Sequence, residues 1–371
     1  MVISTVQVIY SLEIGGVEKL AVTIGAHLDR KKFRPAICAL DGDGVLAEEL
    51  VRHGIPFHVL WRKAIEAGVL VRLYRCFRQE KARIVHTHQF AQLLFSLLPA
   101  KVYGAKIVHT EHEFYIYRNN TRARRLFKQL MRFCSALTVV GPEVARYYIE
   151  ELGVPQERIH VIPNGIDLDQ FNFSSRESRS RLGLSADDLV FGIVGRLEPE
   201  KDHRTLLQAF RALIDHRQAA RLLIIGDGSL RGELESCSRT LGLERNVTFL
   251  GARTDIPEVL AALDVFVLSS VHEGVPLSVV EAMGAGKPVI ATDVGGLRLL
   301  VKPSVNGLLV PPADPAALGA AMRDLAINPT LRQEMGVRSR QIARDSFSVS
   351  TMINRYQEIY ESVLGARDVR N

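Results

Sequence analysis

Residues 272–288 read HEGVPLSVVEAMGAGKP and carry two glutamates, Glu273 and Glu281, eight positions apart. Pro276 suits the first position of a helix, which would run to about Gly284 and place Glu281 about two turns in. The amide N–H groups at the start of such a helix favour an anion, and Gly274 lets backbone approach a ligand closely. Because carboxylates accept hydrogen bonds from sugar or ribose hydroxyls, the stretch is typical of a sugar-phosphate site. The alternative is a surface helix with two solvated glutamates.

A second charged segment, GRLEPEKD, follows the apolar run LVFGIV. Arg196 and Lys201 lie five positions apart across a turn that contains proline. Arginine offers a planar fork of donors and lysine a compact charge, so the pair suits a diphosphate. Taken alone, the segment would more often be a solvated charged turn. Its occurrence together with the 272–288 stretch favours the diphosphate interpretation.

A third segment, SLEIGGVEKL, follows the first apolar run, and its paired glycines, Gly15 and Gly16, precede an expected helix. Paired glycines allow close approach of a ligand to backbone, but a plain tight turn explains them equally well.

Four histidines at two expected strand ends, in HTHQF and HTEHEFY, raise the question of a metal. We expect His86–His88 and His109–His112 to alternate between faces or to lie in turns, so that they form no metal site. They are better interpreted as hydrogen-bonded core or cleft residues. The pairs Asp41/Asp43 and Asp167/Asp169 lie in expected loops without a third ligand. GAGKP lacks the serine or threonine of a phosphate-binding loop, and GDGSLRG is only a weak dinucleotide signal.

Along the whole chain, short apolar runs alternate with amphipathic stretches. This alternation indicates repeated βαβ units with parallel sheets. Strands are expected at STVQVIY, PAICAL, PFHVL, RIVHTH, KIVHT, ALTVV and HVIP, and again at LVFGIVG, ARLLIIG, NVTFLG, DVFVLSS, KPVIAT and NGLLVP. A polar, serine-rich stretch near residues 168–188 separates the two series. We therefore expect doubly wound domains at 1–170 and 171–345 and a terminal helix in 346–371. Ligands of such sheets bind beyond the carboxyl ends of the strands.

Composition indicates an ordinary globular chain of 371 residues, 47% hydrophobic and 24% charged. Its four cysteines are widely spaced, and no secretory signal opens it, so we expect reduced thiols and a cytoplasmic location. The most apolar stretch, AQLLFSLLPAKVYGA, is interrupted by Pro99 and Lys101, and no spanning helix is expected.

The positive charge is concentrated in the first half. Residues 1–167 hold 23 Lys/Arg and 16 Asp/Glu, whereas the remainder holds 24 and 25. Residues 121–134, TRARRLFKQLMRFC, predict a helix with Arg122, Arg124, Arg125, Lys128 and Arg132 on one half and Leu126, Phe127, Leu130, Phe133 and Cys134 on the other. Its basic face either stays in water or meets anionic lipid or a lipid-linked, phosphate-bearing acceptor. The second interpretation would hold the protein peripherally at the inner membrane face.

The chain resembles the retaining glycosyltransferases of family 4, which have the GT-B fold. The resemblance covers nearly the whole length and is carried by GGVEKL, PNGID, GRLEPEKD, GDG, FLG and EGVPLSVVEAMGAGKPVIATDVGG, in this order. It implies two Rossmann-like domains facing a cleft, with the terminal helix crossing back onto the first. It also implies a UDP- or GDP-sugar donor for the second domain. Many members carry a glutamate shortly after the final GG, where this chain has Leu299.

The resemblance further assigns roles to single residues. Arg196 and Lys201 match the family's diphosphate-binding pair, Glu281 the ribose-binding glutamate, and Glu273 the glutamate that holds donor-sugar hydroxyls. His112 would approach the donor sugar from the first domain. The expected catalytic set is His112, Glu273, Arg196 and Lys201. The expected nucleotide-binding set adds Gly15, Gly16, Gly274, Val275, Pro276, Leu277 and Glu281.

The implied reaction is transfer of a sugar, with retention at the anomeric carbon, to an acceptor in glycolipid, polysaccharide or other glycoconjugate biosynthesis. Arg196, Lys201 and the helix start would stabilise the leaving diphosphate, so we expect no metal and no cofactor. Nucleic acid is not an expected partner. A nucleotide-sugar epimerase or hydrolase on the same fold is the alternative, and a nicotinamide-dependent oxidoreductase or a non-catalytic sugar-binding relative are further rivals.

Overall fold

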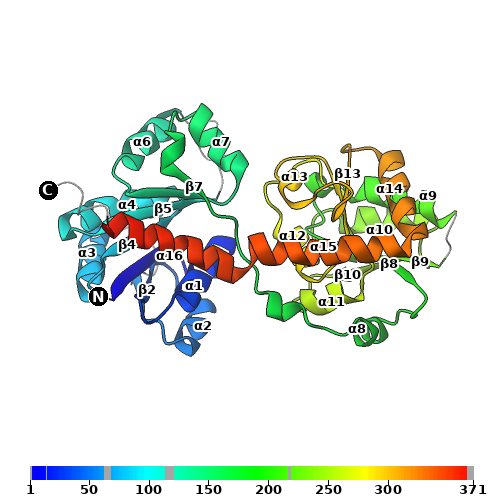
Figure 1. The fold of residues 1–371 in the computed structure, drawn as a ribbon, viewed down its shortest axis with the longest axis horizontal. Coiled ribbons are helices and arrows are strands. Elements are labelled where there is room, and N and C mark those ends of the chain that lie inside the picture. The colour runs from blue at the N-terminus through cyan, green and yellow to red at the C-terminus, as the bar shows by residue number, and fades with distance from the viewer. Residues whose placement is uncertain (1, 14, 62–67, 113–120, 216–218, 366–371) are drawn as a thin grey trace. The chain divides into compact units, whose positions relative to one another are not determined.

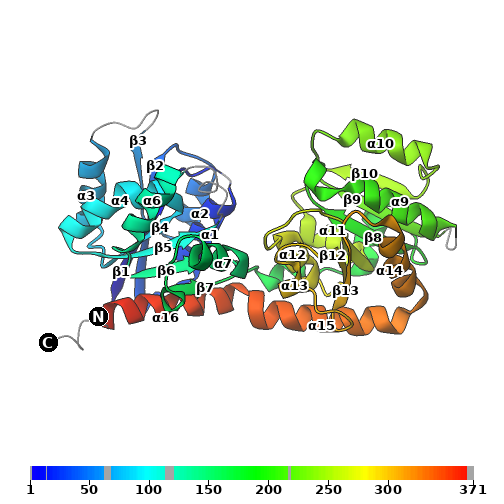
Figure 2. The same cartoon turned by 90° about the horizontal axis from the view of Figure 1, so that it is seen from above.

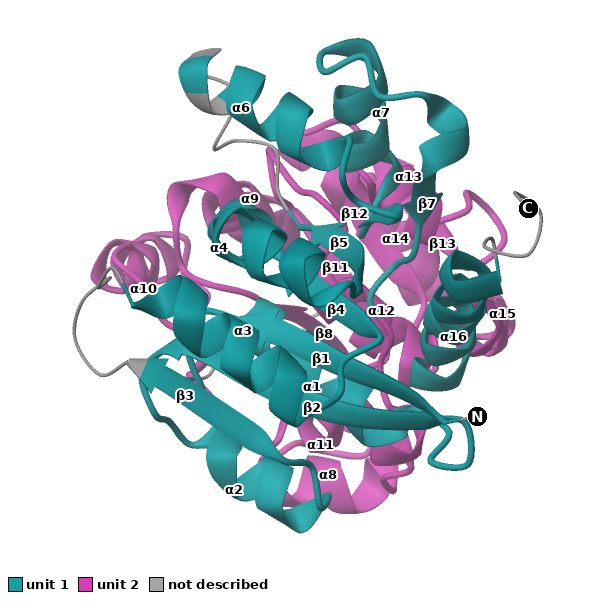
Figure 3. Ribbon diagram, turned by 90° about the vertical axis from the view of Figure 1, so that its left-hand side faces the viewer, with its two compact units in different colours: residues 1–164, 349–371 teal, residues 165–348 magenta. Residues whose placement is uncertain are grey.

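The computed structural model describes residues 2–13, 15–61, 68–112, 121–215 and 219–365. It divides into two compact units, residues 1–164 with 349–371 (unit 1) and residues 165–348 (unit 2), which Figure 3 colours separately. The chain enters unit 2 six residues before the expected boundary at 170. It returns to unit 1 three residues after the expected start of the terminal segment at 346.

Unit 1 is built on a parallel sheet whose described strands follow the order β3-β2-β1-β4-β5-β6-β7. This order reverses between β1 and β4, as in doubly wound dinucleotide-binding folds. Each strand matches an apolar run expected from the sequence. They are β1 (Ile3–Ile9), β2 (Phe33–Asp41), β3 (Phe57–Trp61), β4 (Ile84–His88), β5 (Lys106–Glu111), β6 (Ala136–Val139) and β7 (Ile159–Val161).

Helices connect the strands of unit 1, and the C-terminal helix joins them. They are α1 (Gly16–His27), α2 (Leu46–Arg52), α3 (Val69–Gln79), α4 (Gln89–Tyr103), α6 (Thr121–Met131), α7 (Pro142–Glu150) and α16 (Val349–Gly365). Helix α16 packs against α1 and β5, as Figures 1 and 2 show. Its buried Met352, Tyr356 and Tyr360 join Ile84, Val108 and other side chains of the sheet in one apolar cluster. The terminal helix therefore buries its apolar face on unit 1.

Unit 2 repeats the architecture with a parallel sheet in the order β10-β9-β8-β11-β12-β13. Its strands are β8 (Leu189–Val194), β9 (Ala220–Ile225), β10 (Val247–Gly251), β11 (Val265–Leu268), β12 (Val289–Thr292) and β13 (Gly307–Val310). Its helices are α8 (Ser175–Arg181), α9 (His203–Ile214), α10 (Arg231–Thr240), α11 (Ile256–Ala262), α12 (Leu277–Gly284), α13 (Leu297–Leu300), α14 (Pro315–Ile327) and α15 (Pro329–Phe347). The order again reverses beside the first strand, which places the ends of β8 and β11 at the expected ligand edge.

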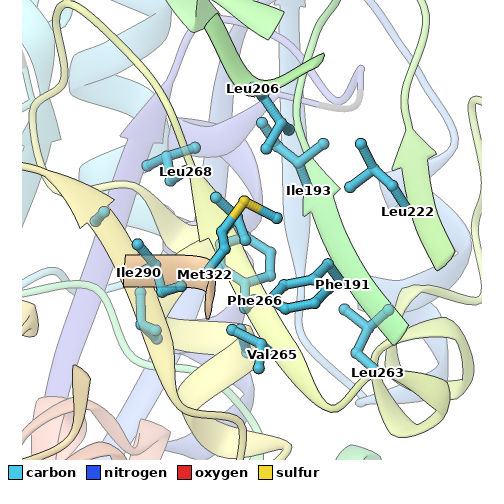
Figure 4. Packing of buried hydrophobic residues seen from close by; sticks show 14 of the residues in the cluster. Phe191, Ile193, Leu206, Leu222, Leu263, Val265, Phe266, Leu268, Ile290 and Met322 are labelled. Atoms are coloured by element: carbon cyan, nitrogen blue, oxygen red, sulfur yellow. The ribbon is translucent and has the colours of Figure 1, made fainter. Parts of the chain in front are cut away.

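The core of unit 2 shows why these runs form strands. Phe191 and Ile193 of β8, Phe266 of β11 and Met322 of α14 are fully buried in one cluster (Figure 4). Strands of a parallel sheet are buried on both faces, so their sequences are continuously apolar. This explains why LVFGIV and DVFVL read as uninterrupted apolar runs.

Helix α4 differs from the sequence expectation, because it continues through Pro99 to Tyr103. A proline removes one hydrogen bond of a helix, a loss that tertiary packing can offset, and Pro99 is buried here. The helix leaves Leu94, Leu98 and Val102 exposed along one line. Among the helices that the structure describes, none combines the length and the apolarity that crossing a membrane requires.

Candidate active site

The segment GRLEPEKD forms the loop between β8 and α9. It ends in a short 3-10 helix, Pro199–Lys201, and Asp202 then caps α9 by accepting a hydrogen bond from the amide of Thr205 at 3.2 Å. The side chain of Arg196 is 75% exposed and donates to Glu200 at 2.9 Å. Lys201 is different: its stem packs over Gly195 and only 15% of its side chain is exposed. The two cations therefore occupy unlike environments.

Lys201 and Glu273 form a direct ion pair within unit 2. Lys201 Nζ lies 2.5 Å from Glu273 Oε1, and the Ser270 hydroxyl donates to the same oxygen at 2.6 Å. Only 9% of the Glu273 side chain is exposed. Hydrogen bonds to ionised groups are the strong ones, and they are stronger where water is excluded. Two residues that the sequence assigned to different parts of the donor are thus partners at the carboxyl ends of β8 and β11.

The start of α12 lies one residue later than expected. Pro276 is the N-cap, with φ −70° and ψ 121°, and the helix begins at Leu277. The proline has extended backbone and offers no side-chain acceptor, so the first amides of α12 are not capped by it. Glu281 lies four residues after Leu277, half-buried. The helix does end at Gly284, as predicted.

Glycines bring neighbouring loops against this helix start. The amide of Gly296 donates to the carbonyl of Gly274 at 3.0 Å, and a Cβ on Gly296 would lie 2.5 Å from that oxygen. The GG that follows β12 therefore holds the loop that carries Glu273, Gly274 and Val275. This close contact requires glycine at position 296, a requirement that the sequence did not reveal.

The segment GDG supports the loop between β8 and α9. Gly226 has φ +139°, and a Cβ there would lie 1.9 Å from the carbonyl oxygen of Gly195. The amide of Leu197 donates to the carbonyl of Asp227 at 3.0 Å. Ser229 donates through its hydroxyl to Glu198 at 2.7 Å. The β9–α10 loop thus fixes the β8–α9 loop, a role that only its position after a strand could have suggested.

His203, beside Lys201, was not singled out in the sequence. The residue is 2% exposed, and neither ring nitrogen has a hydrogen-bond partner among the described residues. Burial, helped by the nearby Lys201 charge, lowers the pKa of His203 to about 4. The imidazole is therefore neutral at physiological pH.

In unit 1, Gly15 and Gly16 stand at the start of α1, as expected. Gly15 is the N-cap in extended backbone, with φ −139°, so its conformation does not itself require glycine. A Cβ there would instead meet the Glu18 carboxylate, whereas a Cβ on Gly16 would meet open space. Space for a close approach of a ligand is therefore present at Gly16.

The histidines of unit 1 converge more than expected. The rings of His86 and His88 lie 4.3 Å apart, and those of His88 and His112 lie 5.7 Å apart. The expectation of alternating faces was wrong for His86 and His88, because residues two apart on a strand share a face. His109 does lie on the opposite face, packed against Phe127 at 5.6 Å. Among the described residues, no group of three metal-ligating side chains is suited to hold an ion.

His112 lies just beyond β5, half-buried. Its Nε2 is 3.4 Å from His88 Nδ1. Burial and the proximity of His109 lower the pKa of His112 to about 3. A neutral ring can accept or donate a hydrogen bond to a sugar hydroxyl but carries no charge.

The predicted basic helix is present as α6, with a less regular apolar side than expected. Phe127, Leu130 and Cys134 are buried, but Leu126 and Phe133 are 41% and 49% exposed. The exposed basic side chains are Arg122, Arg125, Lys128 and Arg132, and Arg124 lies 3.8 Å from Glu151. The helix ends at Met131, three residues before the predicted end at 134, so Phe133 lies in the turn that follows it and not on its apolar face.

Comparison with known proteins matches both halves of the chain. The family model described as glycosyltransferase family 4 matches residues 14–170, and that described as glycosyl transferases group 1 matches residues 174–342. The chain is 34% identical over 253 residues to UDP-Gal:alpha-D-GlcNAc-diphosphoundecaprenol alpha-1,3-galactosyltransferase of Escherichia coli, a match that spans 65% of each chain. It is 30% identical over 318 residues to 2-deoxystreptamine glucosyltransferase of Streptomyces kanamyceticus, covering 81% of this chain and 82% of that one.

Among solved structures, Anabaena Alr3699/HepE in complex with UDP superposes with a TM-score of 0.84 at 25% identity, covering 98% of this chain and 100% of that one. Both sheets of the present chain have the reversed strand order of doubly wound folds, and the motifs at their strand ends fall inside the residues that the two family models match. The chain is therefore a glycosyltransferase with the GT-B fold and belongs to glycosyltransferase family 4.

Proposed function

We propose that the enzyme transfers a hexose from a UDP-sugar to an acceptor with retention at the anomeric carbon. The observation that carries the donor proposal is the Lys201–Glu273 pair with Ser270, beside the start of α12. Lysine has three N–H donors and Glu273 has a second oxygen, Oε2. The pair can therefore meet a diphosphate and a sugar hydroxyl at the same time. The similarity to a UDP-bound protein and to a UDP-galactose-dependent enzyme supports UDP as the nucleotide.

In this proposal each donor group has its own partner. Lys201, Arg196 and the first amides of α12 hold the diphosphate, whose charge grows as the glycosidic bond breaks. Glu281 accepts the ribose hydroxyls, and Glu273 accepts hydroxyls of the sugar. Gly15 and Gly16 lie near the phosphates, and His112 approaches the sugar.

Calorimetry with UDP alone separates the two glutamates. Glu281→Ala should weaken UDP binding by about tenfold, since a charge-assisted hydrogen bond contributes roughly 1.5–3 kcal/mol. Glu273→Gln should leave UDP affinity within about twofold of wild type and reduce transfer from the full donor. Glutamine keeps the Ser270 contact, so it is a better probe than alanine. Equal losses of UDP affinity in both variants would contradict the division.

The reaction type is tested on a panel of nucleotide sugars. A transferase releases UDP in proportion to product and only with acceptor present, whereas the alternative hydrolase releases it without acceptor. Nuclear magnetic resonance of the product gives its anomeric configuration. An inverted product would refute retention and leave the donor site intact.

We propose further that the acceptor is borne by a membrane and carries phosphate. Exposed Leu94, Leu98 and Val102 of α4 form an apolar stripe, and α4 packs against α6. Phe133, after α6, extends the apolar surface and lies under Lys101 Nζ at 3.5 Å. A basic residue near an anionic membrane contributes about 1 kcal/mol, so several together would hold the enzyme peripherally. The acceptor named for the Escherichia coli relative, a diphosphoundecaprenol-linked sugar, is of this class.

Vesicle sedimentation tests this surface. Wild-type protein should bind anionic vesicles at low salt and lose binding at high salt or on neutral vesicles. Arg122→Glu with Arg125→Glu should abolish binding. The matched control, Arg239→Glu with Arg245→Glu in unit 2, removes the same charge from exposed positions and should leave it unchanged. Absence of binding to anionic vesicles at low salt would favour an acceptor in solution.

A further inference from the structure

A chain of buried hydrogen bonds links helix α16 to His112 within unit 1. Tyr360 on α16 accepts from Gln7 Nε2 at 2.9 Å, and Gln7 Oε1 lies 2.9 Å from His88 Nε2. His88 Nδ1 then lies 3.4 Å from His112 Nε2. Gln7, His88 and Tyr360 are each fully buried. The chain therefore joins the C-terminal helix to the strand-end histidine across β1 and β4.

The other end of the chain is anchored on backbone. The Thr138 hydroxyl donates to the carbonyl of His109 at 3.2 Å, and Thr138 also bonds to Thr110. Thr110 Oγ1 lies 2.7 Å from His86 Nε2, and His86 Nδ1 lies 2.7 Å from the Tyr360 hydroxyl. A carbonyl only accepts, so this anchor fixes the direction of every bond that follows.

The direction can be followed bond by bond. Thr138 donates its proton to the carbonyl, so Thr110 must donate to Thr138 and accept from His86 Nε2–H. His86 Nδ1 then carries the lone pair and accepts from the Tyr360 hydroxyl. Tyr360 in turn accepts from the amide nitrogen of Gln7, which agrees with the orientation of that amide.

Beyond Gln7 the same logic reaches His112. Gln7 Oε1 accepts from His88 Nε2–H, so His88 Nδ1 carries a lone pair and accepts from His112 Nε2–H. His112 is thereby held as the Nε2–H tautomer, with Nδ1 as a hydrogen-bond acceptor. Burial lowers the pKa values of His86 and His88 well below the ordinary value, which keeps both rings neutral.

We propose that Tyr360, Gln7 and His88 are positioning residues that fix the tautomer and ring orientation of His112, so that Nδ1 accepts a hydroxyl of the donor sugar. This inference rests on the proposed function of His112. It gives α16 a part in transfer besides covering the sheet. In a neutral histidine, the hydrogen bond made by one ring nitrogen determines which of the two nitrogens carries the proton.

Two tyrosines on α16 provide a matched pair of variants. Tyr360 and Tyr356 are both fully buried, and both rings pack against His86, at 5.7 and 5.3 Å. Tyr356 joins the chain from the side: its hydroxyl lies 3.4 Å from Thr110 Oγ1 and also bonds to Thr138, but it does not lie between His86 and His112. Tyr356→Phe therefore removes one buried hydroxyl without cutting the path to His112, whereas Tyr360→Phe cuts it.

The first measurement is nitrogen nuclear magnetic resonance of the histidine rings in the enzyme without substrate. The His112 signal is assigned as the one that disappears in His112→Gln. In wild type and in the control variant Tyr356→Phe, His112 should be a single Nε2–H tautomer. In Tyr360→Phe the Gln7 amide loses its fixed acceptor, so His112 should populate both tautomers. Gln7→Met should give the same mixed spectrum.

The second measurement is the kinetics of transfer. Tyr360→Phe should lower kcat on the order of tenfold, less than the roughly 10²-fold loss that a 1 Å misplacement can produce. UDP affinity should not change, because UDP lacks the donor hexose that His112 is proposed to contact. Tyr356→Phe should stay within about twofold of wild type, and Tyr360→Phe with Gln7→Met should lose no more than either change alone.

Three outcomes would overturn the positioning role. The first is an equal loss of kcat in Tyr360→Phe and Tyr356→Phe. The second is an unchanged His112 tautomer in Tyr360→Phe. The third is a loss of kcat in the double variant Tyr360→Phe with Gln7→Met that equals the two single losses combined. Failure of the proposed function is distinguishable: if His112→Ala retains full transfer while Tyr360→Phe still mixes the tautomers, the chain positions a ring that transfer does not use.

Discussion

Breaking the Lys201–Glu273 pair should destabilise unit 2 as well as abolish transfer. The two side chains are 15% and 9% exposed and meet at 2.5 Å. Removing one partner of a buried pair leaves an uncompensated charge, which costs about 3–5 kcal/mol. Because Lys201 keeps some contact with water, we expect about 3 kcal/mol for Lys201→Met and a similar value for Glu273→Gln. The double variant buries no charge and should cost no more than one single change, a coupling of about 3 kcal/mol.

The free energies of unfolding should be read from hydrogen exchange of unit 2 peptides in urea, because two units need not unfold together. The matched control is the Arg211–Asp215 pair, whose side chains are 41% and 56% exposed at 2.7 Å. Its double-mutant cycle should give a coupling free energy of about 0.5 kcal/mol or less.

All three variants of the buried pair should lose transfer, by at least about 2 kcal/mol or roughly 30-fold in kcat/KM. Single costs near 0.5 kcal/mol, or a double variant with near-normal transfer, would refute the reasoning.

Two further predictions concern pH and metal. The pKa of His203 is about 4 in the folded state and near 6.5 when unfolded, so the unfolded state binds the extra proton between these values. Stability of unit 2 should therefore fall as pH drops, by about 2 kcal/mol at pH 5. His203→Leu, which removes no hydrogen bond to the described residues, should abolish this loss in urea unfolding at pH 7.5 and 5.0. Transfer should survive EDTA and gain nothing from Mg²⁺ or Mn²⁺; a chelator-sensitive enzyme rescued by either ion would show metal dependence.

Much of the fold could be predicted because it is local. A strand buried on both faces is mostly apolar, and every run that the sequence predicted as a strand is a strand of the expected unit. The helix that ends at Gly284 followed from periodicity and glycine. Two details differed from the prediction: this helix begins at Leu277 and not at Pro276, and α4 continues through Pro99. Both depend on helix capping and tertiary packing, which the local sequence pattern predicts poorly.

The site was predictable in its residue types and less so in its contacts. Lys201 and Glu273 were identified separately, but the pairing joins residues 72 positions apart and depends on the neighbouring positions of β8 and β11. The link from Gln7 to Tyr360 spans 353 positions and has no signal in either segment. His86 and His88 could have been placed on one face from strand periodicity alone.

The pair also bears on how the donor is recognised. Glu273 Oε1 receives both Lys201 and Ser270, so Oε2 is the oxygen suited to accept a sugar hydroxyl. Lys201 directs one donor to Glu273 and has two others for phosphate oxygens. Donor binding can then add partners to a preformed pair without separating it, which avoids exposing a bare buried charge. It follows that neutralising Glu273 should not weaken UDP binding and could tighten it, because the ammonium then has only the diphosphate as its anionic partner. A loss of UDP affinity in Glu273→Gln with unit 2 still folded would mean that the carboxylate holds Lys201 in the orientation that the diphosphate needs.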